Sequence, residues 1–230
     1  LLRAICSLGV SPFLNQMAMF LVQITLNNTL TYYGALSHYG EDIPLACVGV
    51  ISKVNILMLG FTLGISQGCQ PIFSYNYGAR QYSRVREAYR KAIVAASIIC
   101  CIAFVCFQLF PRPIVALFDP SGSEEYFQFA ERYFRIYMFM TLANAFQPIT
   151  ANFFTSIGKA KRGALIALTR QVIFLIPLIL IFPLFLGIDG VMYAGPIADS
   201  AAVVVALALV TREMKRMPHV DEPVAADTLV

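Results

Sequence analysis

The chain has 230 residues, of which 58% are hydrophobic and only 13% are charged, and its formal net charge is +4. Its mean hydropathy is +0.70, and several apolar runs are long enough to cross a bilayer, which excludes a soluble globular protein. The runs have helical length and tolerate Pro and Gly, whereas a membrane barrel would show short alternating segments. The sequence therefore predicts an all-α integral membrane protein.

Six membrane spans are expected in chain order, at residues 13–33, 45–73, 92–110, 136–157, 164–186 and 191–210. Together they make one six-helix unit, residues 12–211. Residues 1–11 form a short lead-in, and Pro12 is placed to open a helix. Residues 212–230 are a polar tail for which we expect disorder. Because the chain starts at Leu1 and shows no signal peptide, we expect a fragment.

Amide side chains in the first span share one helical face. Gln16, Gln23 and Asn27 are spaced by seven and then four residues, which is the repeat of a helix surface. An amide in lipid is costly unless it faces another helix or a cavity. This face is therefore expected to point into the protein or into a cavity.

The second span is longer than a bilayer needs, so we expect it to be tilted, bent or projecting. Gly60, Gly64 and Gly68 recur every four residues and form a smooth stripe for close helix approach. Pro71 frees the carbonyl of Gln67 one turn earlier and is expected to kink the helix.

The second and fourth spans share a short sequence repeat. Residues 70–72 read Gln-Pro-Ile, and so do residues 147–149. Two helices bent at corresponding depths would make a pair of moving parts. The hinge candidates are Gly64, Gly68, Pro71 and Pro148.

The amides of three spans admit two interpretations. Each can form a hydrogen bond between helices, worth on the order of 1 kcal/mol, or can line a substrate cavity without imposing a charge. We expect interhelical hydrogen bonds for single members and cavity lining for the set. The members are Gln16, Gln23, Asn27, Gln67, Gln70, Asn144 and Gln147.

Charge is segregated between the two sets of loops. The links that follow the second and fourth spans and the end of the sixth are basic, whereas the opposite loops carry acids such as Glu41, Asp119 and Asp189. By the positive-inside rule both termini are cytoplasmic, in a multi-pass protein of the inner (plasma) membrane. The positive charge is then a signal of topology, and no nucleic-acid partner is expected.

No enzyme, cofactor or metal motif is present in the sequence, so we expect neither catalysis nor a bound cofactor. Asp199 is the only acid in the middle of a span, and Arg170 lies two turns into the preceding span. Counted from the basic ends of these two helices, an extended arginine can reach the carboxylate. A neutralising ion pair is favoured over a proton relay.

Several motifs resemble the second half of multidrug and toxin extrusion (MATE) transporters. The densest is a run that resembles the end of that family's eighth helix: Gly64, Ser66, Gln67, Gly68, Gln70, Pro71, Tyr75, Asn76, Tyr77, Gly78 and Ala79. Others follow in the family's order: Asn27, Asn28, Gly158, Lys159, Ala160, Arg170, Gln171, Leu186, Gly187, Asp189, Gly190, Pro196 and Asp199. The resemblance covers about residues 8–215 and is greatest to the MepA and DinF-like branch.

This resemblance implies one lobe of a twelve-helix protein in which two six-helix lobes enclose a drug cavity. The missing partner is then the amino-terminal lobe, and residues 1–11 are the end of the linker between the lobes. In one branch of the family, carboxylates of this lobe bind the coupling cation, but the matching spans here offer Asn and Gln. We therefore expect the Na⁺ or H⁺ site in the missing lobe.

The leading functional hypothesis is half of a secondary active exporter, which antiports amphipathic, often cationic compounds against Na⁺ or H⁺. The first alternative is a lipid-linked sugar flippase of the same superfamily. Its cationic lining would have to come from Lys53 or Arg170. The second alternative is a membrane module that does not transport. Membrane lipid and small lipophilic or cationic substrates are the other expected partners.

Overall fold

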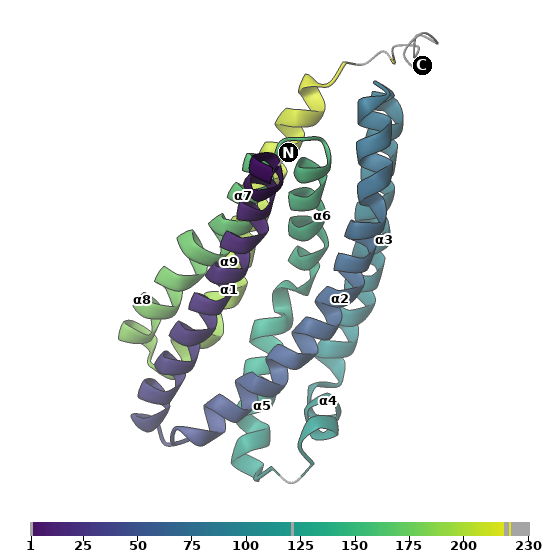
Figure 1. The fold of residues 1–230 in the computed structure, drawn as a ribbon. Helices are drawn as coiled ribbons and strands as arrows, with labels where there is room; N and C mark the ends of the chain where they lie inside the picture. Colours follow the sequence, from purple (N-terminus) through teal and green to yellow (C-terminus); the bar gives the residue numbers. More distant parts are fainter. Residues whose placement is uncertain (1, 121, 219–220, 222–230) are drawn as a thin grey trace.

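Long helices lying side by side make up the structure, a computed structural model (Figure 1). It describes residues 2–120, 122–218 and 221, without the side chains at 2–12, 14 and 144. Every regular element in these ranges is helical, which confirms the all-α prediction. In chain order they are α1 (Leu2–Ala35), α2 (Asp42–Gly78), α3 (Tyr82–Leu109), α4 (Pro111–Phe118), α5 (Glu124–Tyr137), the 3₁₀ helix η1 (Met138–Leu142), α6 (Ala143–Ser156), α7 (Ala160–Leu168), the π-helix η2 (Thr169–Leu175), α8 (Ile176–Leu186) and α9 (Ile188–Arg216).

Four helices within the described residues are long and apolar enough to cross a membrane. They are α2, α3, the continuous helix formed by α7, η2 and α8, and α9. The other two expected spans fall on α1 and on the succession of α5, η1 and α6. The expected span at residues 136–157 covers only the end of α5, then η1 and α6, and within it Met140 leaves helical geometry (φ −91°, ψ 22°), so no single continuous helix spans it.

The observed helix ends differ from the expected ones at three places. α1 already begins at Leu2, so the lead-in and Pro12 belong to the first helix. The basic link expected before residue 92 is the start of α3, where Lys91 pairs with Glu87 at 2.7 Å one turn away. α9 continues to Arg216 rather than ending near residue 210. We expected disorder over residues 212–230, but residues 212–216 belong to α9, and residues 219, 220 and 222–230 lie outside the described residues.

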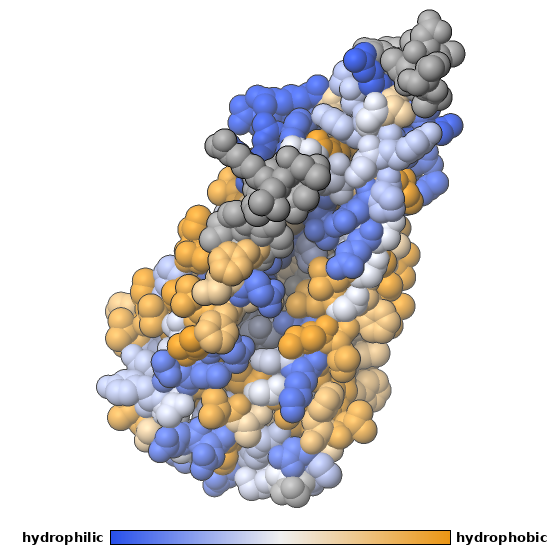
Figure 2. Space-filling view, viewed as in Figure 1, coloured by the Kyte–Doolittle hydropathy of each residue, from blue (hydrophilic) through white to orange (hydrophobic). Residues whose placement is uncertain are grey.

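α6 lies inside the bundle and packs against α2, α3, α7 and α9. Phe73, Tyr89 and Phe153 join α2, α3 and α6 in an aromatic cluster, with the rings of Phe73 and Phe153 edge to face at 5.3 Å. Figure 2 shows apolar side chains over the flanks of the lobe and hydrophilic ones at its two ends. That distribution suits a bundle whose flanks meet lipid.

A buried carboxylate fixes the end of α9. The side chain of Glu213 is only 2% exposed and forms ion pairs with Lys159 and Arg162, which lie at the start of α7. Lys159 also lies 6.0 Å from the centre of the Tyr77 ring of α2. These ion pairs hold the last turns of α9 against the bundle, which explains why the helix runs beyond the expected end of the sixth span. The charge pattern of the sequence did not reveal the pairs.

The chain after α9 returns to the start of α3. The Asp221 carboxylate accepts hydrogen bonds from the backbone N–H and the hydroxyl of Ser83, which lower its pKa. Arg86 donates to the carbonyl of Met217 at 2.9 Å. These contacts tie Met217 and Asp221 to the basic end of the bundle.

Neighbouring helices meet closely at Gly190 but not at Gly64. A Cβ added to Gly190 would lie 2.5–2.6 Å from backbone atoms of Phe182 and Pro183, so α8 and α9 meet there at backbone distance. A Cβ added to Gly64 would meet nothing within 4 Å. The stripe of Gly60, Gly64 and Gly68 is exposed, so within this lobe it packs against no helix.

We expect Gly190→Ala to destabilise the lobe by about 1–3 kcal/mol, because backbone atoms cannot move aside as a flexible side chain can. Gly64→Ala is the matched control and should leave stability unchanged or raised, since alanine favours a helix by about 1 kcal/mol over glycine. Thermal unfolding in detergent measures both. Equal melting temperatures for the two variants would contradict the close approach of α8 and α9.

Candidate functional site

α1 and α2 diverge from the turn at residues 36–41 and leave a hollow between them. α1 packs on α7, α8, η2 and α9, whereas α2 packs on α3, α5 and α6. Figure 1 shows the two helices separating from that turn, and Figure 2 shows the surface hollowed between them, with hydrophilic side chains inside the hollow. The candidate site is this open face of the lobe.

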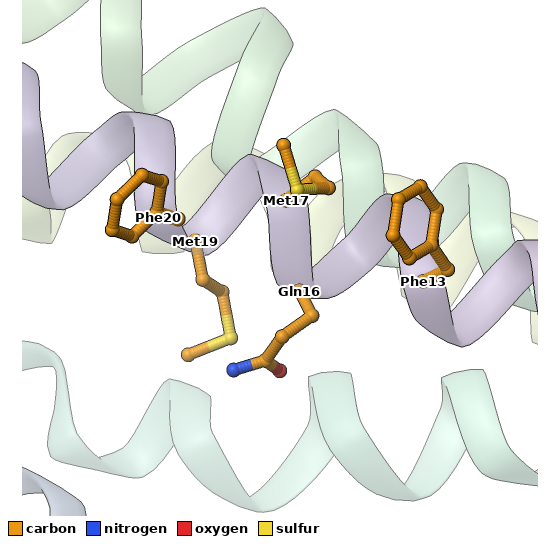
Figure 3. A pocket seen from close by; sticks show the side chains of 5 residues that line it. All are labelled: Phe13, Gln16, Met17, Met19 and Phe20. Carbon is orange, nitrogen blue, oxygen red and sulfur yellow. The ribbon is translucent and has the colours of Figure 1, made fainter.

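A groove of about 400 Å³ lies on the open face of α1. Figure 3 shows the Gln16 amide and the Met19 side chain pointing into the space beside α1, with the rings of Phe13 and Phe20 on either side. Met17 completes the lining, and none of the five residues is charged. Rings and thioethers offer adaptable apolar contacts, and the single amide adds a donor and an acceptor.

A second cavity, of about 130 Å³, lies deeper and is enclosed by six elements of the lobe. Its polar lining consists of Gln23 from α1, Ser52 and Asn55 from α2, Tyr133 and Tyr137 from α5, and Arg170 and Gln171 from η2. At about 30 Å³ per water molecule this volume suits a few waters or a small group rather than a drug-sized molecule.

Arg170 and Asp199 form an ion pair beside this cavity. The Nε of Arg170 donates to Oδ1 of Asp199, and the two side chains are 13% and 12% exposed. The ring of Tyr137 lies against α9 one turn before Asp199. A Cβ added to Gly195 would be 2.6 Å from that ring. The carboxylate already accepts from the guanidinium, which is the geometry of a neutralising pair.

Arg170 belongs to a π-helical turn, which sequence analysis did not anticipate. η2 runs over Thr169–Leu175, between the α-helical segments α7 and α8. A π-turn inserts an extra residue and rotates the side chains that follow, and such turns occur often at functional sites. Both Arg170 and Gln171 reach the cavity from this turn.

We expect Asp199→Asn to lower the free energy of unfolding by about 3 kcal/mol, because it leaves the Arg170 cation buried without its partner. The double variant Arg170→Met/Asp199→Leu removes both charges and should recover most of the loss. Thermal unfolding in detergent measures both variants. A double variant as unstable as the single one would show that the pair does more than neutralise charge.

The predicted amides do not converge on one pocket. Gln147 donates from Nε2 to the carbonyl of Ile166 at 3.5 Å and so links α6 to α7, whereas Gln23 donates to Asn27 at 3.0 Å along α1. Gln16 is exposed in the groove on α1, Gln67 is exposed on α2, and Gln70 is half-buried. The side chain of Asn144 lies outside the described residues.

The hinge candidates lie in regular helix. α2 continues without interruption from Asp42 to Gly78. Its residues Gly64, Gly68 and Pro71 are exposed. Pro148 lies within α6, and its carbonyl accepts from the hydroxyl of Ser66 at 3.3 Å. The described backbone departs from α geometry instead at η1 and η2. Bending at the prolines stays a prediction.

Sequence analysis also missed the polar contacts that hold α6 in place. Asn152 donates to the Ser66 hydroxyl at 2.7 Å, and Tyr89 shares a 2.7 Å hydrogen bond with Thr150. Asn152 is an amide in an apolar run, but nothing in the sequence identifies its partner on α2. These contacts belong to the structural core and not to the open face.

The fold and the open face define one helical lobe of a membrane protein of the MATE transporter class. The solved inward-facing structure of a multidrug resistance MATE family transporter of the MOP superfamily has a TM-score of 0.83 at 20% identity, over 94% of this chain and 48% of that one. An outward-facing structure gives 0.81 at 20% identity, over 91% and 46%. The likeness shows the fold of half such a transporter.

The family model described as MatE matches residues 16–181, so the chain belongs to the MatE family, as the sequence resemblance predicted. The multidrug export protein MepA of Staphylococcus aureus is 23% identical over 212 residues. That match includes 91% of this chain and 44% of MepA. The chain therefore spans about half the length of the curated relatives it matches.

Proposed function

We propose that this chain is one half of a secondary active multidrug exporter. The whole protein antiports amphipathic, often cationic compounds against Na⁺ or H⁺ by alternating access. The observation that carries the proposal is the uncharged groove of aromatic, methionine and amide side chains on the open face of α1. Membership of the MatE family and the similarity to the multidrug export protein MepA support it.

In this proposal the open face is one wall of the substrate cavity, and the amino-terminal lobe supplies the other wall. Phe13, Met17 and Phe20 hold the apolar part of a substrate, since such side chains adapt to different shapes. Gln16 and Gln67 offer hydrogen bonds without selecting a charge. Selectivity for cations and the coupling-ion site then fall to the other lobe.

Rocking of the lobes would move this half as a unit. The chain matches the inward-facing and the outward-facing structures with similar TM-scores, 0.83 and 0.81, which supports a lobe that keeps its internal fold in both states. The Glu213 cluster and the contacts of α6 cross between helices and favour the same behaviour.

The proposed location is the plasma membrane, with both termini in the cytoplasm. The end of the lobe where α3 starts and α9 ends carries Arg84, Arg90, Arg212 and Lys215 on its surface. The opposite end carries Glu41 in the turn between α1 and α2, and this segregation supports the assignment.

A lipid-linked sugar flippase is the second candidate, because it belongs to the same superfamily. It would need cationic side chains in the cavity to hold a pyrophosphate. Arg170 is already paired with Asp199, and Lys53 lines neither the groove on α1 nor the deep cavity, so the exporter is favoured. A module that does not transport would show no efflux at all.

Cells expressing the full-length protein should expel a fluorescent lipophilic cation in a manner that depends on a Na⁺ or H⁺ gradient. Gln16→Ala and Phe20→Ala should each raise the dye concentration for half-maximal efflux about fivefold, equivalent to about 1 kcal/mol of binding. Gln147→Ala is the matched control, because it removes the contact between α6 and α7 and should lower stability without changing that concentration.

An absence of gradient-dependent efflux with every lipophilic dye tested would overturn the exporter proposal. Unchanged efflux in Gln16→Ala and Phe20→Ala, together with a strong effect of Gln147→Ala, would leave the exporter in place but move the substrate wall away from α1.

A further inference from the structure

The last turns of α9 separate their charges onto two faces of the helix. Glu213 points into the bundle and takes Lys159 and Arg162 as partners. Arg212 and Lys215 point outward, and neither takes part in an ion pair between described residues. Arg216 is exposed as well, and the nearest acid on α9, Glu213, is turned away from Arg212 and Lys215 and is already paired.

These cations stand at one end of a shallow groove of about 460 Å³. Leu207 and Ala208 form its apolar part, and Thr211 adds a hydroxyl between them and the two cations. The apolar surface continues along the helix, where Val204 is 66% exposed. The helix surface therefore changes from apolar to basic over about two turns.

The groove lies on the outside of the lobe. Gly195 lines the deep cavity from the opposite side of α9, since about two and a half helical turns separate it from Val204. The groove is therefore not part of the open face of α1 and α2. In a membrane-spanning chain, an outward apolar surface of this kind is in contact with lipid tails.

We propose that this groove binds an anionic phospholipid. The phosphate lies against Arg212, Lys215 and Thr211, and an acyl chain follows Leu207, Ala208 and Val204 along the helix. Charge complementarity selects the headgroup, because basic side chains at a membrane surface attract anionic lipids. The apolar continuation selects a lipid over a free phosphate. The inference does not depend on the transport proposal.

Native mass spectrometry of the full 230-residue chain in detergent tests the inference, with phosphatidylglycerol and phosphatidylcholine as probes. Phosphatidylglycerol should be retained preferentially, and Arg212→Gln/Lys215→Gln should weaken its binding about 30-fold, from about 1 kcal/mol for each basic side chain. Arg84→Gln/Arg90→Gln is the matched control, and it should change binding less than twofold. It removes two exposed charges from the start of α3, which lies at the same end of the lobe as the groove.

Equal losses in the two double variants, or equal retention of the two lipids, would overturn the proposal by reducing the groove to general surface charge. Displacement of phosphatidylglycerol by excess inorganic phosphate would overturn it in favour of a free anion. No lipid preference in the original chain, with a preference appearing in Glu222→Gln/Asp227→Asn, would assign the groove to the acidic carboxyl-terminal residues instead. Melting temperatures of the two arginine and lysine double variants should match, because Arg84, Arg90, Arg212 and Lys215 are exposed.

Discussion

A polar group inside a bilayer must find its hydrogen-bond partner within the protein, and α6 is where this lobe meets that requirement most visibly. The carbonyl of Pro148 accepts a hydrogen bond from the hydroxyl of Ser66 on α2. Asn152 donates to the same hydroxyl, and Thr150 bonds to Tyr89 of α3. With Gln147 bonded to α7, the inner helix is joined to three neighbours by polar contacts as well as by aromatic packing.

Because some polar side chains are bonded inside the lobe, only the others remain exposed on its open face. Gln147 and Asn152 of α6 are hydrogen-bonded inside the lobe, whereas Gln16 of α1 stays exposed in the groove. The charged pair of Arg170 and Asp199 is neutralised next to the deep cavity. The open face therefore combines apolar side chains with uncharged amides, which is the composition we propose for one wall of the substrate cavity.

The sequence was sufficient to predict the helical class, the approximate position of most spans and the family, because apolar length and a dense motif around residues 64–79 are local signals. It also identified Arg170 and Asp199 as candidates for a pair, since helical rise alone shows that they can meet. It did not predict the break at Met140 or the π-turn at Arg170, because both arise from packing between helices and not from composition. The buried role of Glu213 was missed for a similar reason: its partners lie on another helix.

The interpretation of single amides shows the same limit. Gln147 and Gln16 look alike in the sequence, as amides in apolar runs, but one is bonded across an interface and the other lies in an open groove. Only the positions of neighbouring helices separate the two roles. The glycine stripe of α2 is a further case, because small residues suit close packing but here lie on the exposed side of the helix.

Substrate protection of a single cysteine is the most direct measurement of whether the face between α1 and α2 is the substrate wall. In full-length protein without native cysteines, Gln16→Cys should react quickly with a hydrophilic maleimide and be protected by an exported compound. Ile98→Cys on the exposed, apolar surface of α3 should react slowly and show no protection. Equal reactivity at the two positions, with no protection at residue 16, would contradict the assignment of this face to substrate.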